Sequence, residues 1–285
     1  MKDFKDKVAV VTGAASGIGR AMAQRFAREG MKVALADIEP PALAEAERRL
    51  RADGATVLAV PTDVSKAADV EALARRVVDT FGAVHVLCNN AGVFLTGRLW
   101  ERTLADWEWL LSVNLWGVVH GVRTFVPLML RHGEEGHIVN TASMAGLTSM
   151  PYAGVYHVSK HAVVTLSEVL HHELAMSGAK VKVSVLCPGL VNTRIVDSER
   201  NRPAALRNAV DPPSLEGDLA AESLRQALAT GMPPERIADL VHAAIRDERF
   251  YIFPDAGWME VARARIDDIL SARNPTFVLP PMTSE

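Results

Sequence analysis

Seven short, almost continuously apolar runs recur along this chain, separated by longer amphipathic segments. A strand with one face in water alternates apolar and polar side chains, whereas a strand covered on both faces is apolar throughout. The runs therefore predict a parallel sheet with a layer of helices on each face. They occupy residues 7–13, 32–37, 56–63, 84–90, 137–143, 182–189 and 250–254.

Helical patterns fill most of the intervals between these runs. Pro40 and Pro41 suit the first turn of one helix, where a missing N–H costs nothing. Alternating strands and helices favour right-handed crossovers, so we expect an α/β fold: a doubly wound parallel sheet of about seven strands with helices on both faces, in a single domain over residues 1–285. The predicted helices are 17–30, 40–52, 66–81, 104–120, 153–177 and 234–246.

The composition disfavours several classes of protein. With 285 residues, 49% of them hydrophobic, the chain can bury one large core. Its formal net charge of −3 gives no basic field for nucleic acid. No secretory signal opens the chain and no apolar run approaches the roughly 18 residues of a membrane helix, so we expect a soluble, cytoplasmic protein without membrane contact. Cys88 and Cys187 lie in apolar runs and should be buried and reduced.

Two stretches interrupt the strand–helix alternation. Residues 194–233 form a long, charged, proline-containing connection, which predicts a substrate lid, with plain surface disorder as the alternative. Residues 255–285 form a C-terminal extension with a helical pattern. Its apolar residues Trp258, Val261, Ile266 and Ile269 could pack on the body of the protein or on a neighbouring subunit, and periodicity does not choose between these.

A glycine cluster follows the first predicted strand directly. Gly13, Gly17 and Gly19 stand where the strand turns into a helix, so the backbone can approach a diphosphate whose charge is met by the free N–H groups of the helix start. The spacing is T-G-x-x-x-G-x-G. Tight turns alone produce many glycine clusters, but here a strand precedes and a helix follows. The variable positions Ala14, Ala15, Ser16 and Ile18 are expected to serve mainly as backbone donors.

Asp37 ends the second predicted strand about 20 residues after this loop. A carboxylate there can accept both hydroxyls of an adenosine ribose and would repel a 2′-phosphate. Neither Ser16 nor Ile38 adds a cation to hold such a phosphate. The pattern therefore favours NAD over NADP, with an ordinary strand-end aspartate as the alternative.

Tyr156 and Lys160 form the remaining distinctive pair. Four residues turn a helix through about 400°, so both side chains project from one face, although such a pair can also be an accident of a solvated surface. With the glycine loop, these residues make the chain resemble the conventional branch of the short-chain dehydrogenase/reductase family over residues 5 to about 255. The matching segments are TGAASGIG (12–19), DV (63–64), NNAG (89–92), Asn114, Ser143, YHVSK (156–160) and PG (188–189) with Thr193.

This resemblance implies a Rossmann-type fold and a catalytic group of four residues. Oxidising a secondary alcohol requires removal of a hydride, which the nicotinamide accepts, and of a proton, which the protein accepts. In the family reading Tyr156 is the acid/base, and Lys160 lowers its pKa and binds the nicotinamide ribose. Ser143 bonds the substrate oxygen. Asn114 holds a water that links Lys160 to solvent.

The resemblance also implies the remaining contacts. The cofactor-binding residues would be Gly13, Ser16, Gly17, Ile18, Gly19, Asp37, Asp63, Val64, Asn90, Ala91, Gly92, Tyr156, Lys160, Pro188, Gly189, Val191 and Thr193. The substrate would meet Ser143, Tyr156 and an apolar set composed of Val93, Phe94, Met144, Ala145, Leu147, Met150 and Tyr152. A homodimer or homotetramer is expected, in which helix 104–120, with Trp107, Trp109 and Trp116 on it and Trp100 before it, and the Tyr156 helix meet partners; core packing would give the same aromatic pattern.

The sequence thus predicts an NAD-dependent oxidoreductase that interconverts a hydrophobic secondary alcohol and its ketone. Two alternatives remain, an NADPH-dependent ketone reductase and a non-catalytic nucleotide-sensing protein. No metal is expected: His157 and His161 have helical i, i+4 spacing, but no third ligand accompanies them.

Overall fold

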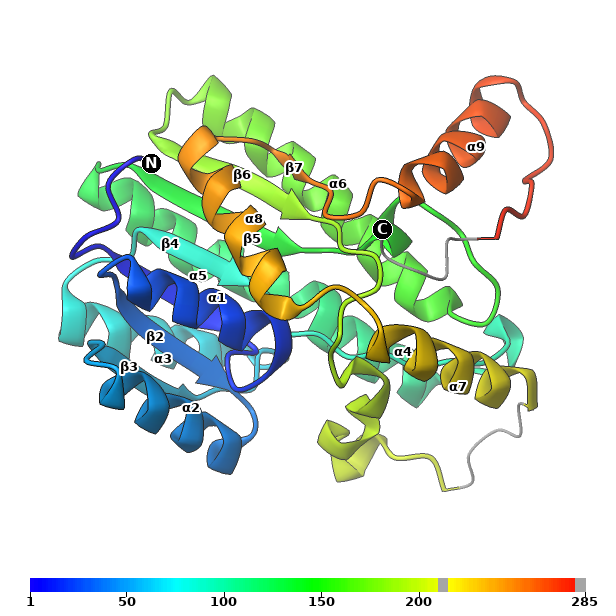
Figure 1. Ribbon diagram of the computed structural model, residues 1–285, viewed down its shortest axis with the longest axis horizontal. Coiled ribbons are helices and arrows are strands. Elements are labelled where there is room, and N and C mark those ends of the chain that lie inside the picture. Colours follow the sequence, from blue (N-terminus) through cyan, green and yellow to red (C-terminus); the bar gives the residue numbers. More distant parts are fainter. Residues whose placement is uncertain (210–214, 280–285) are drawn as a thin grey trace.

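The computed structural model, which describes residues 1–209 and 215–279, contains a seven-stranded parallel sheet between layers of helices (Figure 1). The strand order is β3-β2-β1-β4-β5-β6-β7. This confirms the predicted doubly wound sheet. The strands are β1 (Val8–Thr12), β2 (Lys32–Asp37), β3 (Val57–Pro61), β4 (Val86–Asn89), β5 (Gly136–Thr141), β6 (Val181–Leu186) and β7 (Tyr251–Ile252).

The helices cover both faces of the sheet, as the apolar runs require. Successive residues of β1 point to opposite sides: Ala9 and Val11 pack with α1, α2 and α8, while Val8 and Val10 pack with α3, α5 and α6. Figure 1 shows α1 and α8 side by side on the near face. These helices are α1 (Gly17–Arg28), α2 (Pro40–Ala52), α3 (Ala67–Phe81), α5 (Gly117–His132), α6 (Gly154–Met176) and α8 (Pro234–Asp247).

The helix predicted at 104–120 is longer than expected. It continues as α4 (Leu104–Leu111), a π-helical segment (Ser112–Trp116) and α5, which ends at His132. Gly121 and Pro127 suggest a helix end, but Gly121 instead lets α5 approach β4, because a Cβ there would lie 2.0 Å from Asn89 Oδ1. Among the described residues, Leu104–His132 alone is long and apolar enough to cross a membrane, and a helix packed in a core passes the same test.

The predicted lid contains more regular structure than a loop. Within residues 194–233 the chain forms two 3₁₀ segments, Ile195–Asn201 and Ala204–Leu206, and helix α7 (Leu215–Ala229). We use "lid segment" for its described parts, 194–209 and 215–233; residues 210–214 lie outside the described residues. The helix was missed because the prolines and charges that precede it made the whole interval read as one connection, although Leu215, Leu219, Leu224 and Leu228 have roughly helical spacing.

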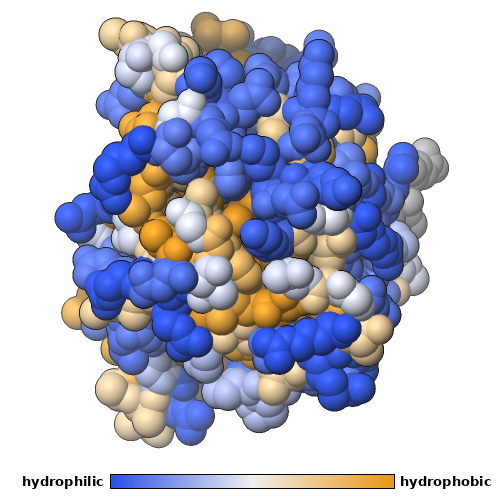
Figure 2. All heavy atoms as spheres, turned by 90° about the vertical axis from the view of Figure 1, so that its left-hand side faces the viewer, coloured by the Kyte–Doolittle hydropathy of each residue, from blue (hydrophilic) through white to orange (hydrophobic). Residues whose placement is uncertain are grey.

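The C-terminal extension packs on the body of the protein through part of one helix. Helix α9 (Trp258–Leu270) buries Val261 and Ala262, whereas Ile266 and Ile269 remain exposed. Residues 280–285 of the predicted extension lie outside the described residues. Figure 2 shows the face at the amino ends of the strands, where hydrophilic residues surround apolar ones. The main cavity lies at the other end of the sheet, next to α4 and α7.

Candidate active site

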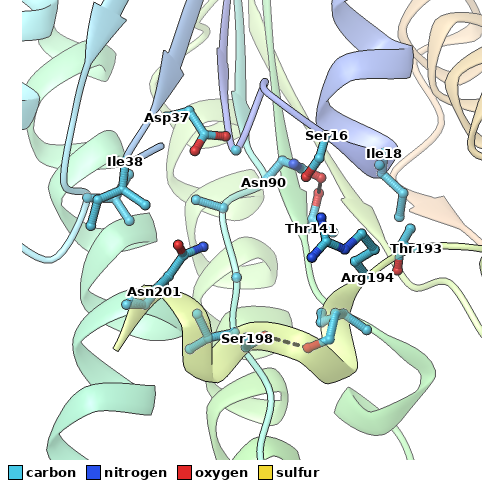
Figure 3. Close-up of a pocket in the computed structure, with 18 of the residues that line it drawn as sticks. Ser16, Ile18, Asp37, Ile38, Asn90, Thr141, Thr193, Arg194, Ser198 and Asn201 are labelled. Atoms are coloured by element: carbon cyan, nitrogen blue, oxygen red, sulfur yellow. Dashed lines mark hydrogen bonds between the residues drawn. The ribbon is translucent and has the colours of Figure 1, made fainter. Parts of the chain in front are cut away.

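A cavity runs along the carboxyl ends of the strands, where the strand order reverses between β1 and β4. Ligands of doubly wound sheets bind in the crevice at this switch point. Segments after β1, β2, β3, β4, β5 and β6 line it, and the lid segment lies across it (Figure 3). The cavity brings together every residue predicted to bind a cofactor except Gly19.

The glycine loop has the close-packed geometry that its sequence predicts. Gly13 and Gly17 have φ of +66° and +52°, a region that favours glycine. Gly19 does not line the cavity. A Cβ on it would lie only 2.1 Å from Gly13 O, so this glycine lets α1 pack against the loop. Helix α1 begins at Gly17 without a side-chain cap, which leaves its first N–H groups available to an anion.

Two of the predicted backbone donors are already used within the protein. The N–H of Ala14 donates to Ala36 O at 3.2 Å, and that of Ala15 donates to Asp37 Oδ2 at 2.9 Å. The expectation that these two residues serve the cofactor is therefore wrong. Ser16 and Ile18, by contrast, both line the cavity.

Asp37 lies at the carboxyl end of β2 with its side chain turned to the cavity (Figure 3). Burial raises the pKa of its carboxyl, and the N–H groups of Ala15 and Glu39 only partly oppose this. Each carboxylate oxygen accepts one of these N–H groups, at 2.9 and 3.0 Å. An oxygen has two lone pairs, so each can still accept a ligand hydroxyl.

Tyr156 and Lys160 lie side by side on α6, and both line the cavity. The Lys160 ammonium is 5.5 Å from the centroid of the Tyr156 ring and donates to Thr141 O at 2.9 Å. Burial lowers the pKa of Lys160 to about 8, so it is mostly charged at neutral pH. Burial also raises the pKa of Tyr156 to about 12, and the nearby Ser143 side chain only partly opposes this. The pKa of Tyr156 is thus raised by burial and not lowered as the sequence predicts.

Ser143 lies two residues after the end of β5, near Tyr156. Its Oγ donates to Pro188 O at 3.3 Å and accepts from Ala145 N at 3.1 Å. The long bond to Pro188 O can be exchanged for one to a substrate oxygen. Ser143 thus has the geometry of a donor to a group bound between Tyr156 and the Pro188–Gly189 turn.

Asn114 lies behind the cavity and does not line it. Its Oδ1 accepts from Val93 N at 2.8 Å, and its Nδ2 donates to Val93 O at 2.9 Å and Ser159 Oγ at 3.2 Å. It therefore holds the backbone after β4 against α6. The π-helical turn that carries Asn114 was not foreseen, and such turns are frequent at functional sites.

The predicted apolar substrate residues divide into two groups. Val93 lines the cavity, whereas the others do not. Met144 and Ala145 are buried, Met144 among core residues beneath α6, and Phe94 packs edge-on against the Tyr156 ring at 4.9 Å. Phe94, Met144, Ala145, Leu147, Met150 and Tyr152 thus lie outside the cavity lining, and for Met144 and Ala145 the reason is that the turn after β5 carries them into the core.

The lid segment supplies cavity residues that were not predicted. Figure 3 shows Arg194 and Asn201 directed into the cavity toward the glycine loop and Asp37, whereas the Ser198 hydroxyl donates to Ile195 O and accepts from Phe94 N. Arg194, Ser198 and Asn201 are spaced about one helical turn apart, and this spacing could have indicated that they lie on one face of a helical segment. The unpredicted lining residues are Ile38, Glu39, Thr62, Trp109, Val113, Thr141, Ala142, Arg194, Ile195, Ser198, Arg200, Asn201 and Leu228.

The histidines of α6 take part in packing. His157 Nδ1 lies 2.8 Å from Thr148 O, and His161 Nδ1 lies 2.9 Å from His157 O. Over residues 1–209 and 215–279, no three His, Cys, Asp or Glu side chains are grouped so as to hold a metal ion. Both cysteines are fully buried and free, as expected.

Comparisons with known proteins agree with this architecture. Residues 7–204 match the family described as short chain dehydrogenase. The chain is 36% identical over 277 residues to "CLA biosynthesis dehydrogenase/reductase" of Lactiplantibacillus plantarum, covering 96% of this chain and 97% of the relative. It is 37% identical over 268 residues to "1-deoxy-11-beta-hydroxypentalenate dehydrogenase" of Streptomyces exfoliatus, covering 93% and 89%.

Among solved structures, a short chain dehydrogenase/reductase from Burkholderia phymatum, described as a complex with NAD, superposes with a TM-score of 0.96. It is 48% identical, and the match covers 99% of this chain and 100% of that one. Together with the parallel sheet and the paired Tyr156 and Lys160, these similarities show that the chain is an oxidoreductase that belongs to the short-chain dehydrogenase/reductase family.

Proposed function

We propose that this enzyme transfers hydride between a hydrophobic secondary alcohol or its ketone and NAD. The proposal rests mainly on one observation: the glycine loop, Ser143, Tyr156 and Lys160 all line the same cavity. A side chain at Gly13 or Gly17 would crowd Ala91 or Thr193, which line the same cavity, so these glycines keep open the space that a dinucleotide would need. Residues Asp37, Asp63, Val64 and Asn90–Gly92 would hold the adenosine side, and Pro188–Thr193 the nicotinamide side.

The bound nicotinamide supplies the hydride chemistry, and the protein handles the proton. In the oxidation direction, Tyr156 as phenolate takes the alcohol proton while Ser143 donates to the same oxygen. In the reduction direction the Tyr156 hydroxyl returns that proton to the ketone oxygen. Lys160 stays close enough to favour the phenolate, and Asn114 positions the backbone around it.

The raised pKa of Tyr156 fits this role once charges are considered. An oxidised nicotinamide ring is a cation, and with Lys160 it would place two positive charges beside the phenol. Both favour the phenolate and oppose the burial that raises its pKa. We therefore expect alcohol oxidation to accelerate with rising pH and ketone reduction to be favoured at lower pH.

NAD is proposed over NADP because Asp37 lines the part of the cavity in which we place the adenosine ribose. The Burkholderia phymatum relative described with NAD supports this choice. The apolar lining residues Val93, Trp109, Val113, Ile195 and Leu228 support a hydrophobic substrate. A hydroxylated substrate is also consistent with the name of the Streptomyces exfoliatus relative.

Assays with a panel of secondary alcohols and ketones, each with both dinucleotides, test this proposal. Tyr156→Phe should lower kcat by at least about 100-fold, the usual contribution of acid–base catalysis, while NADH still binds. Tyr251→Phe is the matched control, because that hydroxyl bonds Glu168 on another side of the molecule. A Tyr156→Phe variant with wild-type kcat would contradict the mechanism. NADH binding without turnover of any substrate would favour the nucleotide-sensing alternative.

We also propose an oligomeric state, a role for the lid segment and a cellular location. Half-exposed Val158 and Val169 on α6, with the fully exposed Met176, suit a homodimer or homotetramer contact. The lid segment lies over the cavity and would close on the substrate. We expect the enzyme to act in the cytoplasm. Light scattering of the purified protein measures the oligomeric state.

A further inference from the structure

A carboxylate other than Asp37 stands at the adenosine end of the cavity, and it holds the lid segment. Glu39 lies two residues after Asp37, and its Oε1 accepts three hydrogen bonds. Arg200 gives two of them, from Nε at 3.1 Å and Nη2 at 2.8 Å, and Asn201 Nδ2 gives the third at 2.8 Å. Figure 3 shows Asn201 reaching from the lid segment toward Asp37 and Ile38.

These contacts occupy the part of Arg200 that would otherwise grip a phosphate. An arginine binds a phosphate through the parallel N–H groups of its planar fork. In Arg200, Nε and Nη2 face Glu39, and Nη1 donates to Arg194 O and Asp197 O at 3.3 and 2.8 Å. Burial favours the neutral form of Glu39, but the bonds from Asn201 and Arg200 outweigh this and lower its pKa. Glu39 is therefore a charged partner at neutral pH.

The position of this pair matters because Glu39, Arg200 and Asp37 line one cavity. A ribose 2′-phosphate at Asp37 would meet two carboxylates, while the neighbouring guanidinium is already neutralised. Arg200 is 161 residues from Glu39 along the chain, so inspection of residues near Asp37 does not reveal this cation. The side chains of Arg200 and Glu39 are 28% and 29% exposed, which leaves room for Arg200 to turn.

We propose that Glu39 is a specificity-determining residue, which disfavours a 2′-phosphorylated dinucleotide by keeping Arg200 engaged. The inference rests on the proposed function, because it assumes that the adenosine ribose lies at Asp37. When Glu39 loses its charge, Arg200 is released and its fork can take the 2′-phosphate. Preference between the two dinucleotides then depends on this pair as well as on Asp37.

Fluorescence titration of NADH and NADPH against four proteins tests the proposal: wild type, Glu39→Gln, Arg200→Gln and the double variant. In Glu39→Gln the affinity for NADPH relative to NADH should rise about 10-fold, the low end for a charge-assisted hydrogen bond. Arg200→Gln alone should give no rise. In the double variant the ratio should return to within about threefold of wild type. Arg200 is then absent, so the only remaining effect is that the Glu39 carboxylate no longer repels the 2′-phosphate.

The matched control is Glu45→Gln on α2, which removes the same charge from an exposed pair with Arg48 outside the cavity. It should leave the ratio unchanged. The proposal is overturned if Glu39→Gln leaves the ratio at the wild-type value, or if the double variant keeps the full rise. A wild type that binds neither dinucleotide would overturn the proposed function together with this inference, whereas normal NADH binding with an unchanged ratio overturns the inference alone.

Discussion

Arg202→Met should measurably destabilise the enzyme, because Arg202 and Asp106 form a nearly dry ion pair. Arg202 Nη2 lies 2.6 Å from Asp106 Oδ1, and the side chains are 2% and 1% exposed. The guanidinium also lies over Trp109, 5.0 Å from the ring centroid, and its Nε donates to Leu206 O at 2.7 Å. This pair anchors the lid segment to α4.

Methionine keeps an apolar stem but leaves Asp106 charged and buried. Removing one partner of a buried pair costs about 3–5 kcal/mol. Arg102 Nη1 remains 3.8 Å from Asp106 and Asn208 donates to it, so we expect the lower end, about 3 kcal/mol. An unfolding entropy of about 2.1 cal/mol/K per residue gives about 0.6 kcal/mol/K for 285 residues, so Tm should fall by about 5 °C.

Calorimetry at pH 7 on wild type, Arg202→Met and Arg202→Met/Asp106→Asn measures this effect. Asparagine at position 106 removes the buried charge that has lost its partner. Its side-chain oxygen can still accept the hydrogen bond from Thr103 N, which Asp106 accepts at 2.9 Å in the wild type. The double variant should therefore recover part of the lost Tm. A single variant that melts with wild type, or a double variant that melts below the single one, would refute the reasoning.

Three further outcomes are expected. Gly19→Ala should lower the free energy of unfolding by about 1–3 kcal/mol in urea titrations, because its Cβ would lie 2.1 Å from Gly13 O; an unchanged midpoint would contradict this packing. Arg194→Gln should raise the Kd for NADH about fivefold and reduce its salt dependence, because Arg194 lines the cavity beside the glycine loop with one long bond, at 3.4 Å, to Asp197; equal Kd values would exclude this contact. Burial lowers the pKa of His137 to about 3, so the fold holds it neutral and stability should be complete above about pH 6.5 and decline below it, by about 2 kcal/mol at pH 5. Near pH 5, unfolding of His137→Gln should take up about one proton fewer than unfolding of the wild type. Urea titrations at pH 7 and 5 measure this difference, and an unaltered pH dependence of the unfolding free energy would contradict it.

Much of the site could be predicted because it lies at strand ends. Gly13, Asp37, Asn90, Ser143 and Gly189 each follow or end an apolar run, and parallel strands bring all their carboxyl ends to one edge. Helix periodicity places Tyr156 and Lys160 on one face, and the resemblance to the family, not periodicity, assigned that face to the site.

Other features depend on contacts between distant segments, which no local pattern encodes. The turn after β5 carries Met144 into the core and not toward a substrate, and Asn114 turns its amide to Val93. The pKa of Tyr156 likewise follows burial, which depends on everything packed around it.

The sequence by itself determined the doubly wound sheet, the edge at which chemistry occurs and the residues of the glycine loop and of α6 that lie there. These follow from periodicity and strand direction, which are local properties of the chain. Only the tertiary structure decided what the lid segment contributes, including Arg200 on Glu39 and Arg202 on Asp106. Those pairs join residues about 100 or more positions apart, and the free energy of such contacts exists only once the chain has folded.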